Sequence, residues 1–446
     1  MTTHFKNAAY GALDYAAHPL GMLLVAPIIL KKLGVAEYGI WTIATAEISV
    51  GGIVASGFCD ANIQRIASLR STGNTQKMIS TVRSMLAINI AAGAMLAALA
   101  WIAAPYAVPH IVVARPELAT ECLVALRIAA VVILVRALES VAGSTQRGFE
   151  AYRGTIQINT VVRLGTLFAA AVLAMLGQRS ASILMATAIF LAVGTVLQLL
   201  RLPRFLKGIS LVPSFQREEG RLLLRTGIFS WIQALGGIVL GQLDRLLLGV
   251  SLGAVAVAPY ALCVQFAQPL SGLTASTLQF LFPHISKRAA HDHPSTIRRT
   301  LLMAFLFNCL IVAGETVVIL VAGRSLIRIW TGPAMAEAVR PIFPIIVLGS
   351  ALMGVSVTAN YALLALKMFR AVTAISLTSR TVTLLLMVYL AHHGGLKGMA
   401  ISRLIYGLLS LLLYVPLARK LGITDSASPS RTRLHVQNQF AEEQRP

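Results

Sequence analysis

Long apolar stretches, separated by short polar connectors, run through the whole chain. A helix needs about 20 apolar residues to cross the hydrocarbon core of a bilayer. By that criterion the pattern predicts an all-α membrane protein with twelve membrane-spanning helices. The predicted spans are residues 10–30, 40–61, 84–104, 119–142, 156–176, 182–200, 222–248, 254–280, 300–321, 341–363, 371–391 and 397–418.

Composition and charge agree with this class. Hydrophobic residues make up 57% of the chain and charged residues 12%, whereas soluble domains carry about 25% charged residues. The net charge of +21 is spread along short connectors, which is typical of membrane topology, so we expect no nucleic-acid partner. The sequence begins without a cleavage pattern, so the first apolar stretch is expected to remain as a helix.

The positions of the basic residues predict the orientation, because Lys and Arg concentrate in cytoplasmic connectors. With the N-terminus inside, 24 of the 38 bases lie in cytoplasmic segments or at the cytoplasmic ends of spans, and nine lie in outer segments or at the outer ends of spans. Both termini are therefore expected in the cytoplasm, with a disordered tail over residues 421–446. The basic connectors 62–83 and 201–221 fit amphipathic surface helices and solvated linkers equally well.

Two stretches half a chain apart resemble each other. LKKLGVAEYGIWTI follows the first span, and VSLGAVAVAPYALC follows the seventh. In each, a Leu-Gly pair precedes an Ala/Val turn, and a tyrosine (Tyr38 or Tyr260) opens the next span. This repeat predicts two six-helix lobes, 1–205 and 206–420, related by a pseudo-twofold axis along the membrane normal.

Arginines inside the spans are the leading candidates for substrate binding, because a charge at the centre of a span costs about 2.5–3.5 kcal/mol on insertion scales. Arg380 lies near the middle of its span, and Asn159 lies one turn before Arg163 on the same face. The candidate substrate-binding residues are Arg127, Arg136, Arg163, Arg380, Arg403 and Asn159.

Other interpretations of these charges remain open. Arg136 and Glu139 are spaced to form an ion pair, and Arg127 and Arg403 lie close enough to span ends to reach the membrane surface. Carboxylates inside spans can exchange a proton or bind Na⁺. The candidates for ion coupling are Glu47, Glu315 and Asp14; for Glu47 and Glu315, pairing with an intramembrane arginine is the alternative.

The sequence contains no enzyme constellation. GxxxxGK[ST], GxSxG and HExxH are absent, and the four cysteines lie in apolar runs without metal-ligand spacing. We therefore expect no catalytic residue, metal or cofactor, and transport driven by ion, voltage or substrate gradients.

The charge inside the spans also favours one kind of substrate. A guanidinium group binds phosphate in a bidentate manner, so several arginines in a central cavity would hold a diphosphate headgroup while a lipid tail stays in the bilayer. An exporter of cationic drugs would instead need an acidic, aromatic cavity, and aromatic residues are only 7% of this chain.

The stretch LDRLLLGVSLGAVAVAPYALCVQFAQPLSGL resembles the second-half signature of polysaccharide-transport flippases, the O-antigen and exopolysaccharide repeat-unit translocases. They belong to the multidrug/oligosaccharidyl-lipid/polysaccharide exporter superfamily. LGVAEYGIWTI resembles the turn between their first two spans, and Pro259-Tyr260 replaces the usual Gly-x-Tyr. The residues that match the motif are Asp244, Arg245, Gly249, Gly253 and Tyr260. We interpret the Asp-Arg pair as partly structural, since adjacent helix residues point about 100° apart.

The resemblance implies translocation of undecaprenyl-diphosphate-linked oligosaccharide from the cytoplasmic to the periplasmic leaflet of a bacterial inner membrane, by alternating access. It implies a lipid-linked oligosaccharide as substrate, membrane lipid as surroundings, and polysaccharide polymerase or chain-length machinery as candidate partners. The alternatives are a multidrug or lipid II exporter of the same superfamily, and a polysaccharide polymerase or ligase. The latter enzymes carry a large outer loop with catalytic Arg or His, whereas the outer loops predicted here are short.

Overall fold

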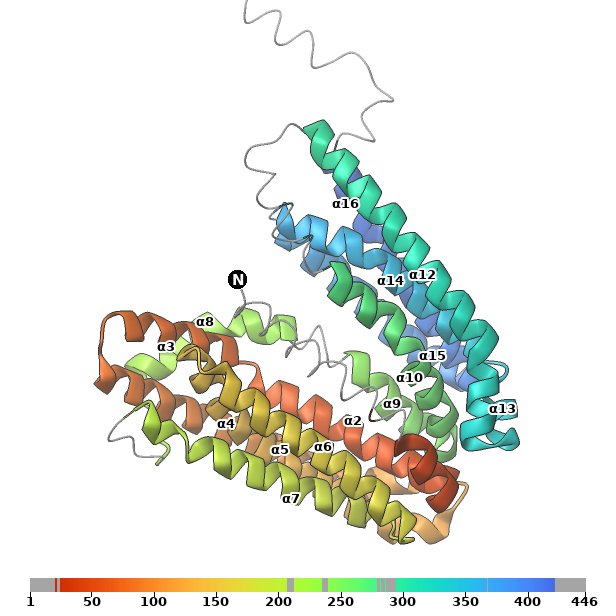
Figure 1. Cartoon of the computed structure of the whole chain (residues 1–446). Coiled ribbons are helices and arrows are strands. Elements are labelled where there is room, and N and C mark those ends of the chain that lie inside the picture. Colours follow the sequence, from red (N-terminus) through yellow and green to blue (C-terminus); the bar gives the residue numbers. More distant parts are fainter. Residues whose placement is uncertain are drawn as a thin grey trace, which may run out of the picture. The chain divides into compact units, whose positions relative to one another are not determined.

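A computed structural model of the chain describes residues 25–206, 212–234, 240–278, 294–366 and 368–421, together with residues 21, 281 and 285. Within these ranges all regular structure is helical (Figure 1). Nine helices in the described part of the chain are long and apolar enough to cross a membrane. The predicted class, an all-α multi-pass membrane protein, is confirmed.

The helices of the first half of the chain are α2 (Val35–Ser56), α3 (Cys59–Ser71), α4 (Thr75–Ile111), α5 (Ala119–Gly148), α6 (Tyr152–Met175) and α7 (Ser180–Leu199). The second half contains α8 (Arg217–Ala234), α9 (Leu240–Leu252), α10 (Ala254–Leu278), α12 (Pro294–Thr331), α13 (Pro333–Val339), α14 (Phe343–Ala365), α15 (Phe369–Ser410) and α16 (Tyr414–Lys420). Short 3-10 helices are η1 (Pro116–Leu118), η2 (Leu202–Arg204) and η4 (Leu411–Leu413).

The element boundaries differ from the hydropathy pattern in one informative place. α15 joins the predicted eleventh and twelfth spans, and its backbone leaves the helical region only at Gly395, with φ 54° and ψ −139°. Parts of the predicted first and seventh spans, and residues 422–446 of the predicted tail, lie outside the described residues. The count of twelve spans therefore stays a prediction.

The chain divides into two compact units. The first comprises the residues up to Ala267 together with Val318–Val347 and Arg380–Arg403, and the second comprises Gln268–Val317, Leu348–Ser379 and the residues from Leu404 onward. In the first unit α5 packs against α2, α3, α4 and α7. In the second, apolar residues of α12, α14 and α16 form a buried cluster that includes Leu301, Leu363 and Leu417. The lobe boundary near residue 205 stays a prediction.

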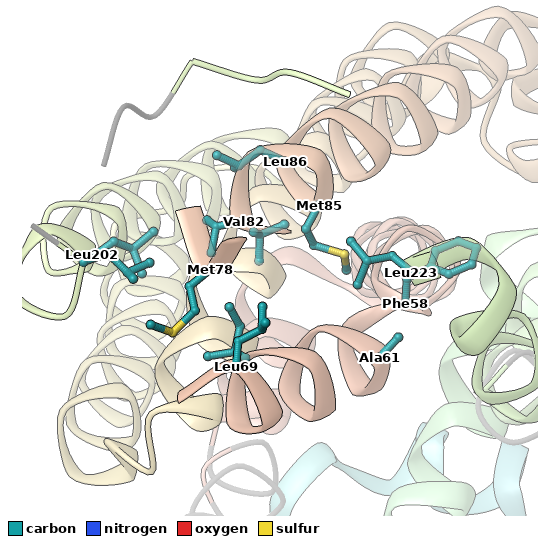
Figure 2. Packing of buried hydrophobic residues seen from close by; sticks show 12 residues of the cluster. Phe58, Ala61, Leu69, Met78, Val82, Met85, Leu86, Leu202 and Leu223 are labelled. Atoms are coloured by element: carbon teal, nitrogen blue, oxygen red, sulfur yellow. The ribbon is translucent and has the colours of Figure 1, made fainter. Parts of the chain in front are cut away.

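The basic connector after α2 forms an amphipathic helix, one of the two alternatives left open by its sequence. Ile66 and Leu69 of α3 are buried, whereas Arg70 is exposed. Figure 2 shows the apolar cluster that covers this face. Its members are Phe58, Ala61, Ile66, Leu69, Met78, Val82, Met85, Leu86, Val141, Leu202, Leu206 and Leu223. α3 connects two apolar helices, so its side chains would otherwise face water. Burying a Leu or Ile of α3 therefore stabilises the fold by about 1.5–3 kcal/mol per side chain.

The two related turns pack against each other within the first unit. Both use a glycine with positive φ, 90° at Gly34 and 81° at Gly253, a conformation that closes a helix C-terminus at little steric cost for glycine. Each glycine N–H bonds the carbonyl four residues earlier. A Cβ on Gly39, at the start of α2, would lie 2.0 Å from the carbonyl oxygen of Ala254. The close approach of α2 and α10 therefore requires glycine at position 39.

Candidate functional site

Three of the residues singled out from the sequence meet in one buried contact of the first unit. The carboxylate of Asp244, on α9, is 1% exposed. Its Oδ2 accepts a hydrogen bond from the Tyr260 hydroxyl of α10 at 2.9 Å and one from Arg403 Nη1 of α15 at 3.1 Å. The Asp244–Arg403 ion pair and the Tyr260 hydroxyl thus tie three helices together.

The adjacent Arg245 does not supply the ion pair of Asp244. The carboxylate Oδ1 accepts the backbone N–H of Arg245 at 2.8 Å, while the guanidinium interacts electrostatically with the hydroxyl of Tyr38 on α2. Tyr38 and Tyr260, the two tyrosines of the repeat, are both fully buried. Tyr260 thus bonds Asp244, whereas Tyr38 lies within the electrostatic field of Arg245.

The remaining motif residues support the same junction. A Cβ on Gly249 would lie 2.5 Å from Cδ1 of Ile43, so α9 and α2 approach closely at this position. A Cβ on Gly253 would lie 3.1 Å from the carbonyl oxygen of Ile111, at the end of α4. These contacts explain the glycines by packing, without a substrate.

Two of the candidate arginines contact neighbouring side chains within the first unit. Arg136 Nη1 lies 2.8 Å from Glu139 Oε2, which confirms the ion pair expected from their spacing. Arg127 lies over the ring of Trp101, 4.9 Å from its centroid, an arrangement that the ring quadrupole stabilises. Both contacts hold a guanidinium group that a substrate would otherwise meet without a protein partner.

Asn159 belongs to a polar layer that the charges alone did not reveal. Its Oδ1 accepts a hydrogen bond from Nε2 of Gln198 on α7 at 2.7 Å, and Gln198 is 1% exposed. Gln146 of α5 accepts from Thr155 at 3.1 Å and donates to the backbone carbonyl of Gln198 at 3.4 Å. The sequence does mark this layer, by glutamines inside apolar spans. These glutamines are not ionisable, so the charged residues alone do not reveal the layer.

For the other candidate residues, the roles in substrate binding and ion coupling stay predictions. Arg163 on α6 and Arg380 on α15 are half-buried, as are Glu47 on α2 and Glu315 on α12. Glu315 belongs to the second unit and Glu47 to the first. Asp14 lies outside the described residues.

A further ion pair, not anticipated from the sequence, fastens α8 to the connector helix α3. Arg65 donates to both carboxylate oxygens of Glu219, at 2.9 and 2.6 Å, and the Thr81 hydroxyl donates to the same carboxylate at 3.2 Å. The Glu219 side chain is 5% exposed and that of Arg65 24%. The hydrogen bonds from Arg65 hold the pKa of Glu219 below its usual range.

Replacing Glu219 by glutamine is expected to lower stability by about 1.5–3 kcal/mol at pH 7, the usual contribution of hydrogen bonds to a charged group. Because the folded-state pKa is lowered, this contribution is complete above the unfolded pKa of about 4.3 and is lost as pH falls through the folded value. Thermal unfolding of both proteins between pH 7 and pH 3.5 should show their difference shrinking at the acid end. Glu218→Gln, on the exposed neighbour, is the control, and an equal effect there would contradict this assignment.

With this geometry in place, the fold can be compared with solved structures. It matches an inward-facing multidrug resistance MATE family transporter of the MOP superfamily with a TM-score of 0.69 and 13% identity, covering 94% of this chain and 99% of the other. It matches the lipid II flippase MurJ with a TM-score of 0.71 and 12% identity, over 92% and 87% of the two chains. The MATE multidrug transporter DinF-BH matches with a TM-score of 0.61 and 17% identity, covering 93% of this chain and 94% of the other. The fold is thus that of a class of multi-pass membrane transporters.

The family follows from the sequence itself. Residues 31–340 match the model of the family described as polysaccharide biosynthesis protein, and the chain belongs to that family. The resemblance to polysaccharide-transport flippases is thereby confirmed, and family and fold together point to a transporter rather than an enzyme. Among curated proteins, none matches the sequence significantly.

Proposed function

We propose that the protein translocates undecaprenyl-diphosphate-linked oligosaccharide repeat units from the cytoplasmic to the periplasmic leaflet of a bacterial inner membrane, for surface polysaccharide synthesis. Membership of the polysaccharide biosynthesis family supports the pathway. The similar structure described as a lipid II flippase supports a lipid-linked substrate. Both termini lie in the cytoplasm in this proposal, as the distribution of basic residues predicts.

The observation that carries the proposal is the set of five half-buried arginines within the spans of the first unit, Arg127, Arg136, Arg163, Arg380 and Arg403. A membrane protein retains such charges where they face an internal partner or a water-filled path. Guanidinium groups match the bidentate geometry of phosphate oxygens. A diphosphate headgroup is the part of the substrate that these groups would hold.

Depth in the span and polar neighbours rank the five arginines as candidates for contact with the diphosphate. Glu139 pairs with Arg136, and Asp244 pairs with Arg403. Arg380, the deepest of the five in its span, is the first candidate, and Arg163 beside Asn159 is the second. In this scheme Glu47 or Glu315 couples the conformational change to an ion gradient.

The proposal is tested with the purified full-length protein in proteoliposomes. A fluorescent undecaprenyl-diphosphate oligosaccharide is placed in both leaflets, and the fraction bleached by external dithionite is measured. Without transport about half of the label is accessible, since the two leaflets hold similar amounts; transport within the assay time should expose nearly all of it. Substrate specificity is tested with lipid II and rhodamine 6G in place of the oligosaccharide lipid.

Each outcome of this assay has a defined meaning. Movement of the oligosaccharide lipid in preference to the two competitors supports the proposal. Movement of lipid II or rhodamine 6G alone would identify an exporter of another substrate. Lengthening of the oligosaccharide, detected by mass spectrometry, would identify a polymerase and overturn the assignment.

A further inference from the structure

A cavity of about 330 Å³ opens where three chain connections of the first unit meet, and none of the five arginines within the spans lines it. The segment before and at the start of α2 contributes Lys32 and Glu37, the turn at η1 contributes Arg115 and Glu117, and the turn before α7 contributes Arg179. All three connections lie on the side that the sequence predicts to face the periplasm. Cavities of this size are typical of small-ligand sites.

The charges around the cavity favour an anion. Three cations and two carboxylates line the cavity, which leaves a net positive charge, and each carboxylate already has a partner. Glu37, which is 6% exposed, accepts the backbone N–H of Ser180 at the start of α7 at 3.0 Å. Glu117 pairs with Arg115 at 3.2 Å. Within the described residues the side chains of Lys32 and Arg179 make no ion pair or hydrogen bond, so both cations are available to a ligand in the cavity that they line.

The backbone adds a second attraction for an anion. α2 begins at Val35, and its N-cap, Gly34, has no side chain to accept the first N–H groups of the helix. Val35 and Ala36 line the cavity, so these N–H groups and the positive end of the helix dipole border it. A Cβ on Gly34 or Gly177 would meet no atom within 4 Å. Neither glycine is therefore packed against another part of the chain.

We propose that this cavity binds the phosphate ester of a membrane lipid headgroup at the predicted periplasmic surface. Two sources share this chemistry. One is an anionic phospholipid of the outer leaflet. The other is the diphosphate of the translocated substrate on its way out of the protein; that source rests on the proposed function, whereas the phospholipid source does not.

The test is a lipid titration of the full-length protein followed by native mass spectrometry. The probes are phosphatidylglycerol, undecaprenyl diphosphate and, as a phosphate-free reference, diacylglycerol. The double variant Lys32→Gln/Arg179→Gln is compared with Arg328→Gln/Lys397→Gln, which removes two exposed cations outside the cavity. We expect the first variant to bind phosphate lipids about thirtyfold more weakly, given the usual contribution of each of the two basic residues at a membrane surface.

The pattern of weakening identifies the source. Weakening confined to phosphatidylglycerol assigns a phospholipid site, and weakening of undecaprenyl diphosphate binding assigns a site on the exit route. Unchanged affinity for both, or equal weakening in the control variant, would overturn the proposal. Because binding is read without transport, its failure leaves the proposed function standing, and failed transport in proteoliposomes leaves this site standing.

Discussion

Replacement of Asp244 by alanine is expected to destabilise the protein by about 3–5 kcal/mol, the usual effect of removing one partner from a buried ion pair. The cost arises from the two groups that lose the carboxylate as their partner. Arg403, with a side chain 16% exposed, would keep its charge without this carboxylate, and the fully buried Tyr260 hydroxyl would lose its acceptor. A desolvated hydroxyl that has lost its acceptor, and a mostly buried guanidinium that has lost this carboxylate, both raise the free energy of the folded state.

Thermal unfolding in detergent at neutral pH measures this effect, with the amount of protein inserted in the membrane as a second reading. Glu337→Ala is the matched control, because that carboxylate pairs with Arg324 and Arg340 at the surface and is 64% exposed. Its loss should cost no more than about 1 kcal/mol. The double variant Asp244→Asn/Arg403→Gln should be more stable than the sum of its single changes predicts. Equal effects of Asp244→Ala and Glu337→Ala would refute a structural role for the contact.

Charge reversal at Arg380 is expected to reduce repeat-unit translocation to background while the protein still inserts into the membrane. A glutamate at this depth would repel the diphosphate that the arginine is proposed to attract, and the electrostatic interaction is strong where water is scarce. Arg380→Lys keeps the charge without the bidentate fork, so it should retain part of the activity.

Translocation in proteoliposomes and surface polysaccharide in cells are the two measurements for this variant. Arg370→Glu, at an exposed position in the first turn of the same helix, is the control and should transport normally. Normal polysaccharide with Arg380→Glu would remove Arg380 from the substrate path. Loss of the inserted protein in both Arg380→Glu and Arg380→Lys would show instead that Arg380 stabilises the fold.

The features that the sequence predicts well are those that depend on neighbours along the chain. The Arg136–Glu139 ion pair follows from a spacing of three residues on one helix. The Leu-Gly turns before Tyr38 and Tyr260 are visible as a repeat, and both adopt the positive φ that glycine permits. The sequence of the connector after α2 fits an amphipathic helix and a solvated linker equally well. The buried apolar face of α3 shows that it is the helix.

The candidate site was only partly predictable, because its contacts join distant parts of the chain. Asp244 and Arg403 are 159 residues apart, and nothing in either local sequence names the other. The adjacent Arg245 is the natural partner in sequence, yet helix geometry points it elsewhere. Gln198 illustrates a second reason. Inserting an uncharged amide into a membrane span costs less free energy than inserting an ion, so a glutamine is a weaker sign of a functional site in the sequence. Gln198 nevertheless donates the hydrogen bond that orients Asn159.

The sequence by itself determines that this is a helical membrane protein of the polysaccharide biosynthesis family, with candidate charges inside its spans. That much is decided by hydrophobic length and local motif, because the bilayer selects helices of about 20 apolar residues regardless of how they pack. Only the tertiary structure decides which charges neutralise each other, because a salt bridge depends on the positions of helices in space. It is the structure that assigns Asp244 to Arg403 and places Lys32 and Arg179 around one open cavity.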